Sequence, residues 1–161
     1  VLGRAVSKLC YETIINNYEG ALEAFDLKES NEEFENLVEA NILLSCIGFE
    51  NTGLSLAHSI NNGLTKFEEG RKFMHGELVA FGTLIQLKIE ENKEFSKIHN
   101  LIKNLNLPDS FNCLNFTDNR KIENLCDDIL EDLQVKNTFK DMRKETLLEA
   151  FKYFINPTLS S

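Results

Sequence analysis

Three histidines are the residues of this 161-residue chain best suited to metal or proton chemistry. His58 lies among small residues, His75 opens an apolar stretch, and His99 lies in a more polar stretch, where we expect an exposed structural residue. His58 and His75 are 17 positions apart, which is not the i, i+4 spacing that places two metal ligands on one helix. A shared metal site would need two helices to converge, and the alternative is two unrelated packed histidines.

The position of His75 favours a metal role. It is expected at the amino terminus of a helix, where the partial positive charge of the helix dipole disfavours imidazolium. Neutral imidazole is the form that binds a metal. The same field opposes a bound cation, and the carboxylate of Glu77 would offset it.

Apolar residues recur at helical spacing along the chain, and no alternating strand pattern of useful length appears. Ser30 and Glu33 form a capping-box pattern. Asn51 and Thr52 are candidate caps for the next helix, which extends to Gly63 and is rich in small residues, so we expect it to be central. The predicted helices begin near Leu2, Tyr18, Ser30, Asn51, His75, Lys93, Asp118 and Asp141. We therefore predict an all-α fold of seven or eight helices in one domain, residues 1–161.

Composition and net charge exclude some classes of binding partner. Apolar residues make up 42% of the chain and there are only two prolines, as expected of a helical globular protein. The net charge of −9 argues against nucleic acid and against an anionic membrane surface. No apolar run is long enough to cross a bilayer.

The four cysteines contain no CxxC pair. Cys10, Cys46 and Cys126 have apolar neighbours and are predicted to be buried small hydrophobic residues. A thiolate zinc cluster and a secreted disulfide framework are both disfavoured, and the pattern fits a reducing cytoplasm.

Two segments around the histidines carry a family resemblance. Residues 48–65 have the sequence GFENTGLSLAHSINNGLT, and residues 75–84 have the sequence HGELVAFGTL. With LCYET at 9–13 and VEAN at 38–41, they resemble the GFE-x-GGLAAAHAIHNGLT, HGE-x-VAFGTL, LCYETL and IEAN segments of glycerol dehydrogenases. The resemblance is dense from Leu9 to Leu87 and thin after Pro108. Glycerol dehydrogenases belong to the iron- or zinc-dependent alcohol dehydrogenases.

The resemblance implies the multi-helix C-terminal domain of the dehydroquinate synthase-like, iron-containing alcohol dehydrogenase fold. In that family the metal lies in a cleft beside a dinucleotide-binding domain, and its ligands are one aspartate and two histidines. The two histidines match His58 and His75. The family aspartate lies in a GxGD motif upstream, and neither this motif nor the glycine-rich segments that bind NAD occur here. We therefore expect a metal-carrying fragment from which the N-terminal dinucleotide-binding domain is absent.

The implied function is NAD-linked oxidation of glycerol or a similar small polyol to the ketone. Zinc or ferrous iron would act as a Lewis acid, with His58 and His75 as ligands rather than general bases. NAD would be bound mainly by the absent domain. We expect the fragment alone to be inactive and the full-length protein to be a cytoplasmic homo-oligomer.

Two alternatives remain open. A related enzyme could act on a 2-hydroxy acid or on glycerol phosphate, and Arg71 and Lys72 are the only basic residues near the motifs that could bind the phosphate. Alternatively, the chain is a non-catalytic helical interaction module. Two departures from the family segments affect substrate preference: Asn61 replaces a histidine and Thr52 replaces a glycine.

Overall fold

The computed structural model of the chain describes residues 1–137 and 141–155, and within them the regular structure is helical, with no strand. The chain divides into two compact units, Val1–Gly53 and Leu54–Ser161, which are described separately below. The predicted all-α class is confirmed. One domain over residues 1–161 stays a prediction.

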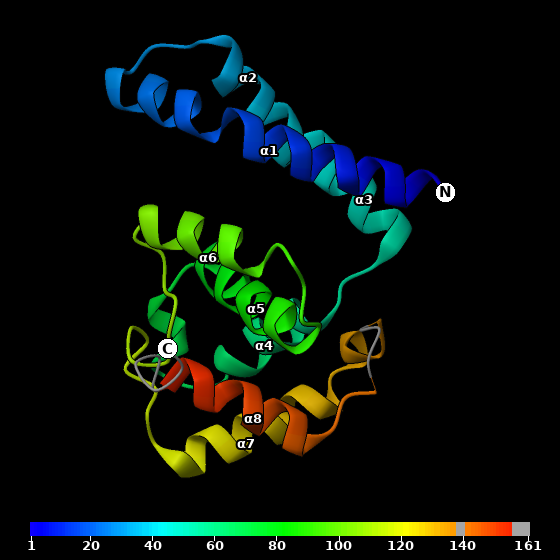
Figure 1. Cartoon of the computed structure of the whole chain (residues 1–161), viewed down its shortest axis with the longest axis vertical. Helices are drawn as coiled ribbons and strands as arrows, with labels where there is room; N and C mark the ends of the chain where they lie inside the picture. The colour runs from blue at the N-terminus through cyan, green and yellow to red at the C-terminus, as the bar shows by residue number, and fades with distance from the viewer. Residues whose placement is uncertain (138–140, 156–161) are drawn as a thin grey trace. The chain divides into compact units, whose positions relative to one another are not determined.

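The first unit is a helical hairpin. Helix α1 (Leu2–Leu27) ends at Lys28, whose φ of 56° is left-handed, and the chain then returns through α2 (Glu32–Glu39), the π-helical turn η1 (Ala40–Leu44) and α3 (Ser45–Thr52). Both α2 and α3 pack along α1, as Figure 1 shows in blue and cyan.

The hairpin differs from the sequence prediction in two places. A separate helix starting at Tyr18 was predicted, but α1 is continuous, and the Asn17 amide donates to the Thr13 carbonyl 2.7 Å away within it. The N-cap of α2 is Asn31 rather than Ser30: its Oδ1 accepts from the Phe34 backbone N–H at 2.8 Å. Asn31 prevails because its amide also donates to the Gly20 carbonyl of α1, at 3.0 Å.

Burial after η1 also departs from expectation. Cys126 is buried as predicted and Cys10 is half-buried, but Cys46 is exposed. A π-helical turn accommodates an extra residue and so rotates the face presented by the following helix. The spacing of apolar residues therefore does not predict which face of α3 is buried, and Phe49 is exposed as well as Cys46.

The second unit consists of α4 (Leu56–Leu64), the 3-10 turn η2 (Gly70–Lys72), α5 (His75–Ile89), α6 (Phe95–Asn104), α7 (Asn119–Glu131), the 3-10 turn η3 (Leu133–Asn137) and α8 (Lys144–Ile155). Helices α4 and α5 form its most extensive pair, and α7 and α8 pack against this pair. As predicted, α4 is central, and α7 begins after Asp118, which caps it by accepting from the Arg120 N–H at 2.8 Å.

An aromatic core fixes α5 in place. The buried ring of Phe81 on α5 meets Phe111 and Phe154 edge-on, with centroid distances of 5.1 and 5.7 Å. Phe151 of α8 packs edge-on against Phe111 at 4.9 Å. Such edge-to-face pairs are favourable beyond the area that they bury. The helix that carries His75 is therefore held rigidly from its buried side.

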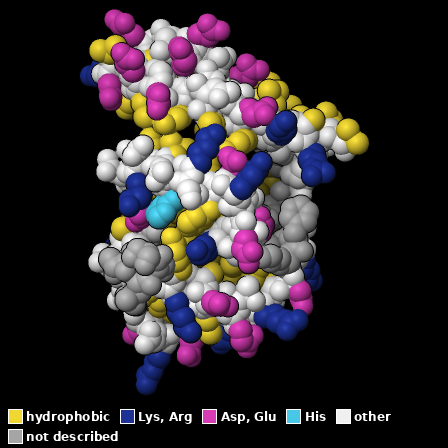
Figure 2. All heavy atoms as spheres, in the orientation of Figure 1, with side chains coloured by type: hydrophobic (Ala, Val, Ile, Leu, Met, Phe, Trp, Pro, Cys, Tyr) yellow, Lys and Arg dark blue, Asp and Glu magenta, His cyan; other side chains and the backbone are white. Residues whose placement is uncertain are grey.

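Most of the net negative charge of the chain lies in the hairpin. Residues 1–53 contain ten acidic and three basic residues, whereas the remaining residues contain sixteen and fourteen. Figure 2 shows the acidic side chains gathered over α1 and α2. Among the helices in the described parts of the chain, none is long and apolar enough to span a membrane.

Candidate metal centre

His58 and His75 come together in the second unit. His58 lies in the first turn of α4, and His75 is the first residue of α5. Their ring centroids are 5.6 Å apart and the ring planes are inclined by 49°. Two helices therefore bring the histidines together despite their 17-residue separation.

This separation suits one shared metal ion. Two imidazoles bound at about 2 Å to one tetrahedral ion have their ring centroids about 5 Å apart. Neither ring has a side-chain hydrogen-bond partner within residues 1–137 and 141–155, so the ring nitrogens are not committed elsewhere there. Over the same residues, no group of three or more His, Cys, Asp and Glu side chains forms a metal cluster. The pair thus fits as an incomplete ligand set.

The protonation of His58 also suits a metal ligand. His58 is half-buried, and burial, followed by the charge of His75, lowers the pKa of its ring. Both effects disfavour imidazolium, because a charged ring is poorly solvated there and repelled by its neighbour. His58 is therefore biased toward the neutral form that can coordinate a cation. His75 is exposed, so the pair is accessible from one side.

Two residues set where the helices begin and how closely they approach. Glu77 accepts a hydrogen bond from the Met74 backbone N–H at 2.7 Å and so fixes the start of α5 beside His75. Gly82 lies against the Ala57 backbone, where an added Cβ would stand 3.0 Å from the Ala57 Cα and would overlap its carbonyl oxygen. Sequence reasoning missed Gly82, because its neighbour is distant along the chain.

His99 is not part of this centre. On α6, its Nε2 lies 3.2 Å from Oδ2 of Asp109 in the loop that follows, and its side chain is 19% exposed. The prediction of an exposed structural residue was therefore wrong about exposure: the contact with Asp109 half-buries the ring.

Comparison with known proteins supports the resemblance to glycerol dehydrogenases. No protein-family model matches the chain. The chain is 37% identical over 115 residues to a glycerol dehydrogenase of Pseudomonas putida, covering 70% of this chain and 32% of the relative. A glycolaldehyde reductase of Halobacterium salinarum is 42% identical over 92 residues, covering 57% of this chain and 25% of the relative.

A solved structure decides the relationship. The crystal structure of a probable glycerol dehydrogenase from Sinorhizobium meliloti 1021 matches 99% of this chain with a TM-score of 0.90 and 29% identity. By sequence and by fold, the chain is a relative of glycerol dehydrogenases. It covers 46% of the S. meliloti chain, and about a third or less of the two relatives matched by sequence.

Both departures from the glycerol dehydrogenase segments have definite places in the structure. Asn61, which stands where those segments have a second histidine, is buried in α4, and its amide donates to Asn62 Oδ1 at 3.1 Å. Thr52 was predicted to cap α4 but is the last residue of α3, where its hydroxyl donates to the Gly48 carbonyl at 2.9 Å. Ser55 occupies the N-cap of α4 instead.

Arg71 and Lys72, the basic residues considered for a phosphate substrate, contact other groups of the chain. The Arg71 guanidinium donates to the carbonyls of Thr65 and Lys66 at 2.9 and 3.0 Å, which stabilises the carboxyl end of α4. Lys72 lies 4.0 Å from the Glu68 carboxylate, and both side chains are exposed. In this chain, Arg71 and Lys72 therefore do not form a prearranged phosphate-binding site.

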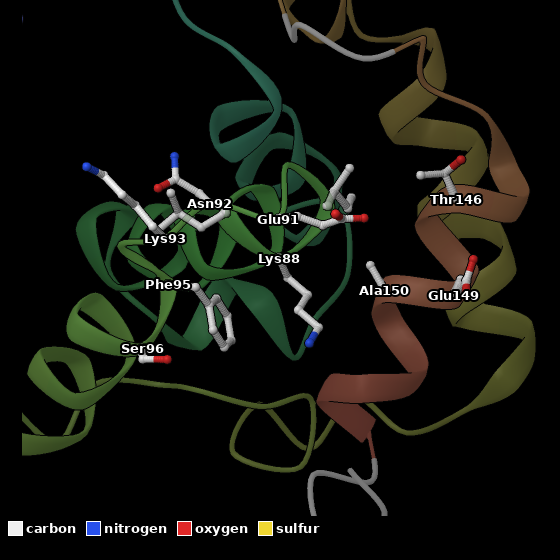
Figure 3. Close-up of a pocket in the computed structure, with 11 residues that line it drawn as sticks. Lys88, Glu91, Asn92, Lys93, Phe95, Ser96, Thr146, Glu149 and Ala150 are labelled. Carbon is white, nitrogen blue, oxygen red and sulfur yellow. The ribbon is translucent and has the colours of Figure 1, made fainter. Parts of the chain in front are cut away.

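One cavity of the second unit lies away from the histidine pair. About 650 Å³ in volume, it lies between the carboxyl end of α5, the start of α6, and α8, as Figure 3 shows. Lys88 extends into it and lies over the Tyr153 ring, with its Nζ 3.9 Å from the centroid. Lys88 follows His75 by thirteen residues, which is about 20 Å along a helix axis. This cavity is not part of the candidate metal centre.

Proposed function

We propose that this chain is part of an NAD-linked, metal-dependent alcohol dehydrogenase that oxidises glycerol or a similar small polyol to the ketone. The observation that carries the proposal is the convergence of His58 and His75 within the segments shared with glycerol dehydrogenases. The two rings belong to different helices, and their spacing matches a shared ion.

In this function His58 and His75 would be two ligands of zinc or ferrous iron. A bound metal would supply Lewis-acid stabilisation of the alcohol oxygen as its proton leaves. The third ligand and most of the NAD site would lie outside residues 1–161. What the chain contributes is position: α4 and α5 hold the two imidazoles at a fixed separation. We therefore expect the 161-residue chain alone to be inactive.

A second candidate substrate class is the small hydroxyaldehydes. It is favoured by the glycolaldehyde reductase relative, whose substrate, like glycerol, is small and hydroxylated. The engaged guanidinium of Arg71 makes glycerol phosphate less suitable. We also propose a homo-oligomeric full-length protein, and a reducing cytoplasm as its compartment, in keeping with four free cysteines.

The test measures NADH formation by the full-length protein with glycerol, before and after chelation, and in the His58→Ala variant. We expect activity to be lost on chelation and restored by zinc or ferrous iron, and to be lost in His58→Ala. His99→Ala is the matched control, because His99 is paired with Asp109 and is expected to leave activity intact. Activity that survives both chelation and His58→Ala would refute the proposal. Consumption of NADH with glycolaldehyde, without NADH formation from glycerol, would instead assign the reduction of a small hydroxyaldehyde.

A further inference from the structure

The side-chain amide of Gln86 joins α5 to the first turn of α4. Its Oε1 accepts hydrogen bonds from the Ser55 hydroxyl at 2.9 Å and from the Ala57 backbone N–H at 3.1 Å. Its Nε2 donates to Glu90 Oε1 at 2.9 Å, one turn further along α5. Every hydrogen-bonding atom of the amide except one N–H is thus given a partner, which fixes its orientation.

Helix α4 depends on this amide for its cap. The first N–H groups of a helix have no partner within the helix, and a side chain at the N-cap commonly supplies one. Ser55 is the N-cap residue, but its side chain makes no capping hydrogen bond to α4 and donates to Gln86 instead. The cap of α4 therefore comes from α5, thirty-one positions along the chain from Ser55.

We propose that Gln86 is a positioning residue of the metal centre: it fixes the start of α4 on α5, and so sets the position of His58 relative to His75. This inference rests on the proposed function, in which the two histidines bind one metal. Ala57, which donates to Gln86, immediately precedes His58, and Gln86 and His75 share one rigid helix. The hydrogen bond thus connects the backbone beside one ligand to the helix that carries the other.

Loss of the acceptor should weaken metal binding. In Gln86→Leu, the Ala57 N–H and the Ser55 hydroxyl lose their partner, so the first turn of α4 is free to fray or shift. Removing groups that orient metal ligands typically lowers metal affinity about 10–100-fold. We expect a loss in that range, although Gln86 contacts neither histidine ring through a hydrogen bond.

The experiment measures zinc affinity of the full-length protein by competition with a chromophoric chelator, and the visible spectrum of the cobalt(II) form. Gln86→Leu should lower zinc affinity at least tenfold and alter the intensity of the cobalt bands. Glu90→Gln alone keeps the Oε1 acceptor and should retain wild-type affinity. The double variant Gln86→Glu with Glu90→Gln reverses donor and acceptor between the two positions, keeps an acceptor for Ala57, and should restore both affinity and spectrum.

The outcomes separate this inference from the function on which it rests. If His58→Ala binds zinc as the wild type does, the proposed metal centre is wrong. If His58→Ala loses zinc while Gln86→Leu keeps wild-type affinity and cobalt spectrum, only the positioning role is wrong, even where Gln86→Leu unfolds at a lower temperature. Should Gln86→Leu fail to fold, the double variant decides: a folded protein with wild-type affinity supports the role, and a folded protein with lowered affinity overturns it.

Discussion

The replacement Gly82→Ala should separate the two histidines with the smallest possible change in chemistry. The new Cβ would stand 3.0 Å from the Ala57 Cα and 3.1 Å from its carbonyl carbon, where ordinary contacts begin at 3.4 Å, and would overlap the Ala57 oxygen more severely. These are backbone atoms, so α4 itself must move. Loss of the groups that orient metal ligands typically lowers metal affinity about 10–100-fold, and we expect zinc affinity of the full-length protein to fall within that range.

The stability change should be modest by comparison. Overpacking typically costs about 1–3 kcal/mol. Alanine in a helix interior recovers up to about 1 kcal/mol relative to glycine. Urea unfolding of the metal-free protein and zinc affinity by chelator competition would therefore be measured on the same samples, so that a loss of metal binding is not confused with unfolding.

Gly63→Ala is the matched control: Gly63 also lies on α4, but it faces α7 rather than α5. Its added Cβ would meet Leu125 Cδ1 at 2.7 Å and Ile129 Cγ1 at 3.3 Å, which belong to side chains that can move without shifting α4. We expect a comparable stability loss with zinc affinity within about twofold of wild type, because cores absorb such changes by repacking. Equal zinc affinities in Gly82→Ala and wild type, or equal losses in both variants, would refute the geometric reasoning.

Three further predictions concern Gly76 and the cysteines. An alanine Cβ at Gly76 meets nothing within 4 Å, so Gly76→Ala should stabilise α5 by about 0.5–1 kcal/mol in urea unfolding, and a lower unfolding midpoint would contradict it. Burial raises the pKa of the Cys126 thiol to about 12, against an ordinary value of 9.0. Because the folded state then holds a proton that the unfolded state releases, stability should fall as pH rises above about 9, less steeply in Cys126→Ala. At pH 8 a thiol reagent should label the exposed Cys46 and Cys113 first, and mass spectrometry showing early labelling of Cys126 would count against this burial.

Helix positions were accessible from the sequence where local signals act alone. The starts of α5 at His75 and of α7 near Asp118 were both predicted, because the helical spacing of apolar residues begins there. The cap of α2 was misplaced by one residue, because Ser30 and Asn31 are both good capping residues. What selects Asn31 is its hydrogen bond to Gly20 on another helix, which no local pattern contains.

The candidate metal centre shows the same division between local and long-range signals. Motif resemblance proposed His58 and His75 as ligands, and helix assignment placed one on each of two helices, but their approach depends on contacts between residues distant in sequence. Gly82 permits the approach because its neighbour is the Ala57 backbone. Gln86 caps the start of α4, for which the sequence predicted Asn51 or Thr52. Neither role follows from periodicity, which reports only which face of a helix is buried.

These contacts suggest how α4 and α5 would keep the two proposed metal ligands, His58 and His75, in register. Gly82 sets a lower limit to the separation of α4 and α5, since the backbones already touch there. Gln86 opposes further separation, since moving α4 away would break two hydrogen bonds at once. Glu77 fixes the helix end that carries His75. Gly82 thus limits how closely α4 and α5 approach, and Gln86 limits how far they separate, both beside His58. Together they hold the two rings near the spacing that one shared ion would require, before any metal binds.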